Sequence, residues 1–246
     1  MESQVIRAEL PYAALFVTVL AGVAAWWIYV PIHELLHALG CWVTGGAVSR
    51  LEIAPEYGGA LLAHVFPFVV SGGDYAGRLS GFDTHGSDLV YLATDAAPFL
   101  LSIVLGVPLL RASNRGRRPL RFGTAVVLAL APFYSLTGDY YEMGSILVTR
   151  AATLAHGGGP LRFASLRSDD VVRLVTQLWT QPHDLQLDNP GGVATGLIII
   201  GLSLLLGTIL ALVTYCIGTL ISFGARTGGA ESGLPVSSRH VPSAAP

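Results

Sequence analysis

The sequence predicts an all-α polytopic membrane protein with about four transmembrane helices and a short membrane-associated β-hairpin between the first two. Three observations lead to this fold class. Of the 246 residues, 52% are hydrophobic and 12% are charged, whereas a typical soluble domain carries about 25% charged residues. The mean hydropathy is +0.59. Four apolar segments also reach the roughly 20 residues that a helix needs to cross about 30 Å of hydrocarbon.

The predicted spans cover residues 12–43, 88–110, 122–148 and 193–223. The first is about twice as long as the apolar core of a signal peptide, so we expect it to be retained. As one straight helix it would be about 50 Å long, so it must tilt, project or bend, and Pro31 offers a bend. We interpret residues 1–223 as one membrane-embedded domain. Residues 224–246 are expected to form a disordered polar tail.

The connections between the spans carry two further signals. Residues 49–73 alternate apolar and polar side chains around Gly58 and Gly59, which predicts a β-hairpin at the membrane face. The loop between the second and third spans contains five arginines: Arg111, Arg115, Arg117, Arg118 and Arg121. The positive-inside rule places this loop, and with it both termini, on the cytoplasmic side.

Two patterns in the second half of the chain predict packing. In the loop of residues 149–192, Ser168 can cap a helix whose apolar face comprises Val171, Leu174, Val175 and Leu178. We interpret it as a surface helix resting on the bilayer or on other spans, and a substrate-gating element is the alternative. The fourth span carries a stripe of small residues at four-residue spacing: Ser203, Gly207 and Ala211. Such a stripe permits close approach of a neighbouring helix.

Charge and cysteine content narrow the class of partner. The net charge of −2 gives no global basic field for nucleic acid, so no nucleic-acid partner is expected. Cys41 and Cys216 lie far apart in apolar segments. A disulfide framework or a cysteine-based zinc site therefore has no support. The expected surroundings are a lipid bilayer.

A polar motif stands near the end of the first span. His33 and His37 are four residues apart, so on a helix both imidazoles project from one face and can share a metal ion. Glu34, next to the first histidine, can act as the catalytic base toward a metal-bound water. Ionisable groups are penalised at membrane depth and indicate a functional site there. We expect one zinc ion, because imidazole suits zinc; interfacial histidines satisfied by hydrogen bonds are the structural alternative.

A catalytic zinc site normally has three protein ligands, so another residue must complete the set. Cys41 is excluded because it would lie about 12 Å from His33 along a straight helix. Asp139 in the third span is the predicted third ligand, and Glu142, one turn further on, is the alternative ligand or an outer partner that orients one.

The second span contributes further candidates. Asp95 and Pro98 are candidates for substrate binding, in which Asp95 would hydrogen-bond substrate backbone or a ligand histidine. An N-cap or helix-break role of Asp95 next to Pro98 is the alternative. Alternate spans run in opposite directions, so His33, Asp95 and Asp139 are all expected toward one membrane face.

These motifs resemble the site-2 protease family of intramembrane zinc metalloproteases. His33-Glu34-Leu35-Leu36-His37 matches the first family motif fully. Ala97-Pro98-Phe99-Leu100-Leu101 matches the second motif in its proline, and Thr137-Gly138-Asp139-Tyr140 supplies the aspartate of the third in altered surroundings. The stretch 45–63 resembles the membrane-associated hairpin of the family. The resemblance covers about residues 10–150.

The resemblance implies hydrolysis of peptide bonds in transmembrane or membrane-anchored protein substrates, with a regulatory membrane partner as a further expectation. The family often faces its catalytic centre toward the cytosol, whereas the arginine-rich loop places this centre on the opposite side, so the side is left open. Two other classes remain: a non-proteolytic membrane zinc-binding or transport protein, and an inactive protease-like scaffold. Clustering of the polar residues at one face argues against transport. A purely structural zinc site does not need a catalytic base, so the presence of Glu34 argues against an inactive scaffold.

Overall fold

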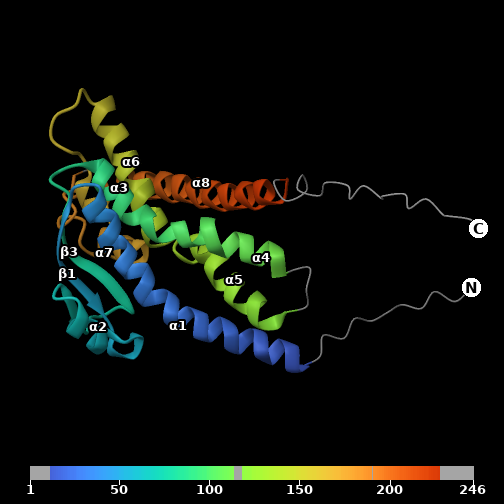
Figure 1. Cartoon of the computed structure of the whole chain (residues 1–246). Helices are drawn as coiled ribbons and strands as arrows, with labels where there is room; N and C mark the ends of the chain where they lie inside the picture. Colours follow the sequence, from blue (N-terminus) through green and yellow to red (C-terminus); the bar gives the residue numbers. More distant parts are fainter. Residues whose placement is uncertain (1–11, 114–117, 190, 228–246) are drawn as a thin grey trace, which may run out of the picture.

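Four helical segments are long and apolar enough to cross a membrane, which confirms the predicted multi-pass integral membrane protein (Figure 1). The computed structural model describes residues 12–113, 118–189 and 191–227. The spans are Tyr12–Val43, Asp88–Ser113, Pro119–Ala155 and Gly192–Phe223. Two arginines of the predicted cytoplasmic loop, Arg115 and Arg117, and most of the predicted polar tail lie outside the described residues. The sidedness of the protein stays a prediction.

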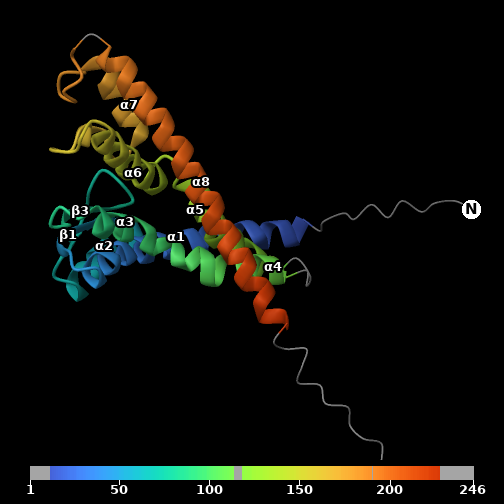
Figure 2. The ribbon, with the colours of Figure 1, turned by 90° about the horizontal axis from the view of Figure 1, so that it is seen from above.

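The first and last spans are single long helices. Helix α1 (Tyr12–Val43) is one continuous helix that contains Pro31 in its interior. Helix α8 (Gly192–Thr227) begins one residue before the predicted start at 193 and extends to residue 227, so the first residues of the predicted tail belong to the helix. Seen from above, α8 runs obliquely to α1 (Figure 2).

The two middle spans are segmented. The second consists of α3 (Asp88–Ala96), η2 (Ala97–Phe99), η3 (Ser102–Gly106) and α4 (Val107–Ser113). The third consists of α5 (Pro119–Tyr134) and α6 (Asp139–Ala155), separated by a turn in which Gly138 and Tyr140 donate backbone bonds to the carbonyl of Ser135. The predicted third span is therefore present as two helices, and the break makes Asp139 the first residue of α6.

A three-stranded sheet follows α1, with strand order β2-β1-β3. Strand β1 (Ala47–Ile53) is parallel to β2 (Val69–Ser71) and antiparallel to β3 (Gly77–Asp83). Between β1 and β2 the chain forms η1 (Pro55–Tyr57) and α2 (Gly59–Val65). The predicted hairpin turn at Gly58 and Gly59 is wrong because Gly59 opens α2.

The glycine pair has a different physical use in this connection. Gly58 adopts a left-handed φ of +83° that ends η1. A Cβ atom on Gly59 would lie 2.0 Å from the carbonyl oxygen of Ile53. Leu62 of α2 and Leu35 of α1 pack on the buried residues Leu51 and Ile53, which holds the sheet against the metal-motif end of α1.

Helix α7 (Val171–Thr180) lies after η4 (Ala164–Leu166) and packs against α8. Its N-cap is Asp170, whose side chain accepts from the backbone N–H of Arg173 at 2.9 Å, and not the predicted Ser168. Ser168 instead accepts from the backbone N–H of Asp170 at 3.0 Å. Three of the four predicted apolar residues are buried: Val171, Leu174 and Leu178. Val175 is 39% exposed.

Close contact between α6 and α8 confirms the packing role of the small-residue stripe. Ser203 and Ala211 are fully buried. A Cβ atom on Gly207 would lie 2.3 Å from the carbonyl oxygen of Tyr140, and one on Gly144 would lie 2.1 Å from that of Ser203. Both helices therefore need glycine where they cross.

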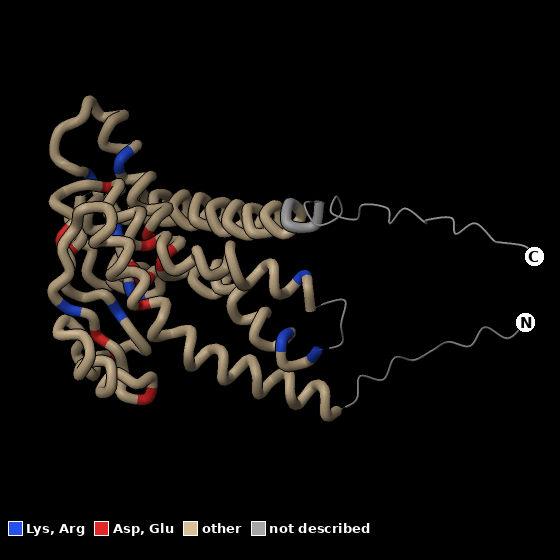
Figure 3. Tube along the Cα trace, in the orientation of Figure 1, with Lys and Arg blue, Asp and Glu red and all other residues tan. Residues whose placement is uncertain are grey.

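Charge is distributed unevenly between the two ends of the spans. Among the residues that the structure describes, the end where α4 and α5 meet carries basic residues without acidic ones, whereas both signs mix at the end that carries the sheet and α7 (Figure 3). The polar end is where the predicted site residues of α1, α3 and α6 lie.

Candidate metal centre

His33 and His37 lie one helical turn apart on α1 and face the interior of the protein. Only 7% of His33 and 6% of His37 are exposed. Their Nε2 atoms are 3.1 Å apart. Residues four apart on a helix share a face, so the local helix alone brings the two rings together, as the sequence predicts.

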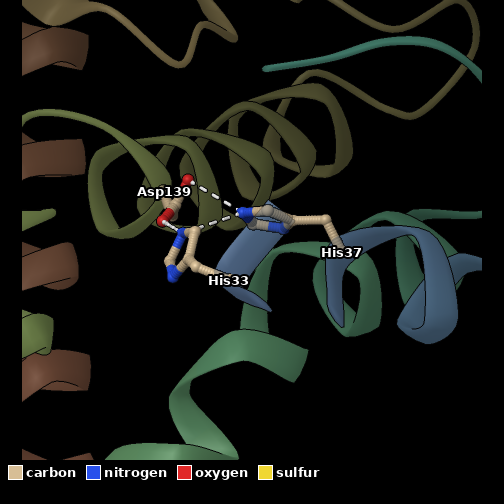
Figure 4. Close-up of side chains that lie close together, drawn as sticks. All are labelled: His33, His37 and Asp139. Atoms are coloured by element: carbon tan, nitrogen blue, oxygen red, sulfur yellow. Dashed lines mark hydrogen bonds and ion pairs between the residues drawn. The ribbon is translucent and has the colours of Figure 1, made fainter. Parts of the chain in front are cut away.

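Asp139 completes a group of three metal-type donors (Figure 4). Its Oδ2 atom lies 3.1 Å from His33 Nε2, and its Oδ1 atom lies 3.5 Å from His37 Nε2. The ligand atoms of the three residues all lie within 4.8 Å of one another. Because Asp139 opens α6, the positive end of the helix dipole favours its negative charge. The group can hold a metal ion.

Each histidine uses its other ring nitrogen for a fixed hydrogen bond. His33 Nδ1 is 2.7 Å from the hydroxyl of Tyr29, one turn earlier on α1. His37 Nδ1 is 2.8 Å from the carbonyl oxygen of Thr94 on α3, to which it donates. Outer partners of this kind fix the tautomer and the orientation of metal-binding histidines. Because His37 Nδ1 donates to a carbonyl, the lone pair of neutral His37 is on Nε2, on the side of Asp139.

The donor set fits a tetrahedral metal ion. Two ligands held at about 2.0–2.1 Å by a tetrahedral ion lie about 3.3 Å apart. The two Nε2 atoms lie 3.1 Å apart, and each lies 3.1 or 3.5 Å from a different oxygen of Asp139, which is close to this value.

Pro98 explains why the carbonyl of Thr94 is free. In a helix this carbonyl would accept from the backbone N–H four residues later, and proline has none. The vacant acceptor is the one that receives His37 Nδ1. Pro98 itself is buried in η2 and does not line the cavity described below. The next residue, Phe99, places its ring edge to face with His33, with 5.5 Å between the ring centroids.

Glu34 lines a cavity of about 480 Å³ together with His37 and Asp139. Strand β3 passes directly over it: a Cβ atom on Gly77 would lie 2.3 Å from Glu34 Cγ. The first residue of β3 must therefore be glycine for the strand to approach the carboxylate this closely.

Asp95 and Glu142 line the same cavity but are not part of the three-donor group. Asp95 is 4% exposed and Glu142 is 9% exposed. Glu142 accepts from the hydroxyl of Tyr91 at 2.5 Å. Both residues therefore lie close to the metal centre, as the sequence predicts. Substrate binding by Asp95, and the role of Glu142 as an alternative ligand or outer partner, stay predictions.

One ion pair and one hydrogen bond join the cavity wall to the start of α7. Arg78 of β3 binds Asp169 with separations of 2.7 and 3.0 Å, and Tyr75 donates to Asp170 at 3.0 Å. The backbone N–H of Arg173, followed by the Tyr75 hydroxyl, holds the pKa of Asp170 below its ordinary value of 3.8. These contacts join the sheet to the start of α7.

Sequence reasoning missed three residues that support the centre: Tyr29, Thr94 and Phe99. Tyr29 had a usable signal, since it stands four residues before His33 and shares its helix face. Thr94 contributes its backbone carbonyl to His37, and Phe99 packs its ring on His33 from another helix. Neither contact can be recognised from the neighbouring residues in the sequence. In comparisons with known proteins, no family model, no curated protein and no solved structure matches the chain.

Proposed function

We propose that the protein is an intramembrane zinc metalloprotease of the site-2 protease kind, which hydrolyses peptide bonds of transmembrane or membrane-anchored proteins. One observation carries the proposal: His33, His37 and Asp139 converge from two spans, and Glu34 of the same motif lines the cavity beside them. This combination of three donors and an adjacent carboxylate is what metal-assisted peptide hydrolysis requires.

The donor set supports zinc in particular. Two imidazole nitrogens and one carboxylate oxygen match the composition of catalytic zinc sites, which keep one position open for water or substrate. When bound, zinc supplies a Lewis acid that polarises the scissile carbonyl and lowers the pKa of a coordinated water to about 7.

The protein side chains supply the positioning and the proton transfer. Tyr29 and the Thr94 carbonyl hold the two imidazoles in place through their Nδ1 atoms. The carboxylate of Glu34 takes the proton from the attacking water and delivers it to the nitrogen of the leaving amine. Strand β3, lying against Glu34 at Gly77, limits access of bulk water to that carboxylate.

The position of the centre sets a requirement for the substrate. A transmembrane helix hides its carbonyls in internal hydrogen bonds, so it must unwind locally before one can be attacked. The cavity of about 480 Å³ lies at the polar end of the spans, where an unwound segment can find water and polar partners.

Transport of zinc is less well supported. A transport route needs polar or ionisable groups through the thickness of the membrane. Among the described residues, the buried histidines and acids are His33, His37, Asp95 and Glu142. All four belong to the metal centre or to the adjoining cavity.

Replacing Glu34 by glutamine tests the proposal. The Glu34→Gln protein, purified in detergent, should retain about one zinc ion per chain but lose more than about 99% of the cleavage of labelled single-span peptides, because the proton acceptor is gone. The control is Glu56→Gln, the same change at an exposed position. Normal cleavage by Glu34→Gln, or a wild-type protein without zinc, would contradict the proposal.

A further inference from the structure

Two carboxylates in the cavity, Asp95 and Glu142, form no ion pair among the described residues. Asp95 is 4% exposed, and its Oδ2 atom is buried without any hydrogen-bond partner in the described part of the chain. Glu142 is 9% exposed and receives one hydrogen bond, from Tyr91. Buried acids remain ionised only when a cation pairs with them, so this part of the cavity favours a positively charged ligand.

The two acids lie on facing helices beside the metal centre. Asp95 stands one turn after Tyr91 on α3, and Glu142 stands one turn after Asp139 on α6. The Tyr91–Glu142 hydrogen bond joins the two helices. The residue before Asp95 binds His37 through its carbonyl, so the acids adjoin the centre from both helices.

The arginines that line the cavity already have other partners. Arg78 forms its ion pair with Asp169. Arg167 binds Asp88 at 2.7 Å and also donates to the Thr149 hydroxyl and the Ile146 carbonyl. Neither arginine forms an ion pair with Asp95 or Glu142 within the described ranges.

We propose that Asp95 and Glu142 form a subsite for a basic side chain, lysine or arginine, that flanks the scissile bond of the substrate. This proposal rests on the proposed function and deepens it by naming a specificity determinant. A guanidinium group presents several N–H donors in a planar fork and can bridge two carboxylates on facing helices. The cavity of about 480 Å³ has the size of pockets that enclose small ligand groups.

A second metal ion at these acids is the weaker alternative. Among the described residues, one group of three or more metal-type donors comes close enough to share an ion, and it consists of His33, His37 and Asp139. Neither Asp95 nor Glu142 belongs to it. A substrate cation needs no such cage, because two carboxylates suffice to pair with it.

Binding to the zinc-loaded Glu34→Gln protein tests the subsite without hydrolysis. The probe is a fluorescent octapeptide, acetylated at its N-terminus and amidated at its C-terminus, with a single central arginine. The control peptide has the same sequence with citrulline, the neutral analogue of arginine, at that position. The arginine peptide should bind at least about tenfold more tightly, as expected for charge-assisted hydrogen bonds in a buried site. Asp95→Asn and Glu142→Gln should each reduce this preference to about twofold or less, whereas Asp83→Asn, at an exposed position of β3, should preserve it.

The other outcomes separate the alternatives. Equal binding of the two peptides to the Glu34→Gln protein would overturn the subsite, and this comparison needs no pocket variant to fold. Tighter binding of a citrulline peptide with a free amino terminus would assign the acids to a terminal ammonium group and overturn the side-chain assignment. Two zinc ions in the wild type and one in Asp95→Asn would assign them to a metal. Failure of the proposed function would appear separately, as loss of zinc binding or of wild-type cleavage.

Discussion

Helices α1 and α8 are both long and apolar, but they satisfy their polar side chains in different ways. On α8, most described serines and threonines that form a side-chain hydrogen bond donate to a carbonyl of their own helix, as Ser203 does to Ile199 at 2.7 Å. The exceptions are Thr195, which donates to Gly191 just before the helix, and Thr214, which also accepts from Tyr140 of α6. On α1, His33 and His37 reach atoms of other helices, namely Asp139 and the Thr94 carbonyl. Polar groups satisfied within their own helix indicate packing, whereas groups that converge from several helices indicate a site.

The largest effect should come from removing a ligand on α1. His37→Ala should weaken zinc binding by more than the roughly 10–100-fold that losing an outer partner costs, and cleavage should fall with it. Ser203→Ala is the control on α8, because its hydroxyl bonds only its own helix turn. Zinc content and thermal unfolding of both proteins would be measured. Full zinc occupancy in the His37→Ala protein would contradict the assignment of His37 as a zinc ligand.

Tyr29→Phe tests whether the outer partner of His33 matters to the centre. The change removes the hydroxyl that lies 2.7 Å from His33 Nδ1 and leaves the ring in its buried position. Zinc affinity should fall by about 10–100-fold. Competition with a chelator of known affinity would measure it. Unchanged affinity would mean that packing alone orients His33.

Packing of α8 should respond to the volume of one side chain. Gly207→Ala would place a Cβ atom 2.3 Å from the Tyr140 carbonyl oxygen, so it should destabilise the protein by about 1–3 kcal/mol. Gly201→Ala makes the same change on the same helix where nothing lies within 4 Å. Thermal unfolding in detergent would compare the two. Equal stability of both variants would show that α6 and α8 tolerate separation.

Much of the fold and the ligand set could be predicted, because their signals are local. The four spans follow from runs of apolar residues, and the four-residue spacing of His33 and His37 places both rings on one face. Asp139 stood out as an acid in an apolar segment. The break that lets its carboxylate reach the histidines was not predicted, because residues 135–138 form a turn that no proline marks.

The errors arose where tertiary contacts decide between residues of similar propensity. Gly58 and Gly59 suggest a hairpin turn, but Gly59 is needed because its backbone lies against the Ile53 carbonyl. Ser168 and Asp170 are both good N-cap residues. The backbone N–H of Val171 donates to the Thr137 carbonyl at 3.1 Å, which fixes where α7 begins and leaves Asp170 as its cap. Neither contact is visible in the local sequence.

The smallest predicted effect lies at Asp170, which links the sheet beside α1 to the helix that packs on α8. Asp170→Ala removes the N-cap of α7 and the acceptor of Tyr75, and should lower stability by about 1 kcal/mol. Asp170→Asn keeps an acceptor for the cap and should lose less. Thermal unfolding at neutral pH would measure both.

The pH dependence at this residue has a definite sign. Because folding lowers the pKa of Asp170 below 3.8, its charge stabilises the folded protein above that pH, and the contribution disappears as pH falls through the lowered pKa. The difference in unfolding temperature between wild type and Asp170→Asn should therefore shrink below about pH 3.8. The exposed Asp188→Asn is the control. A difference that stayed constant down to acid pH would mean that the cap acts through its geometry alone and not through its charge.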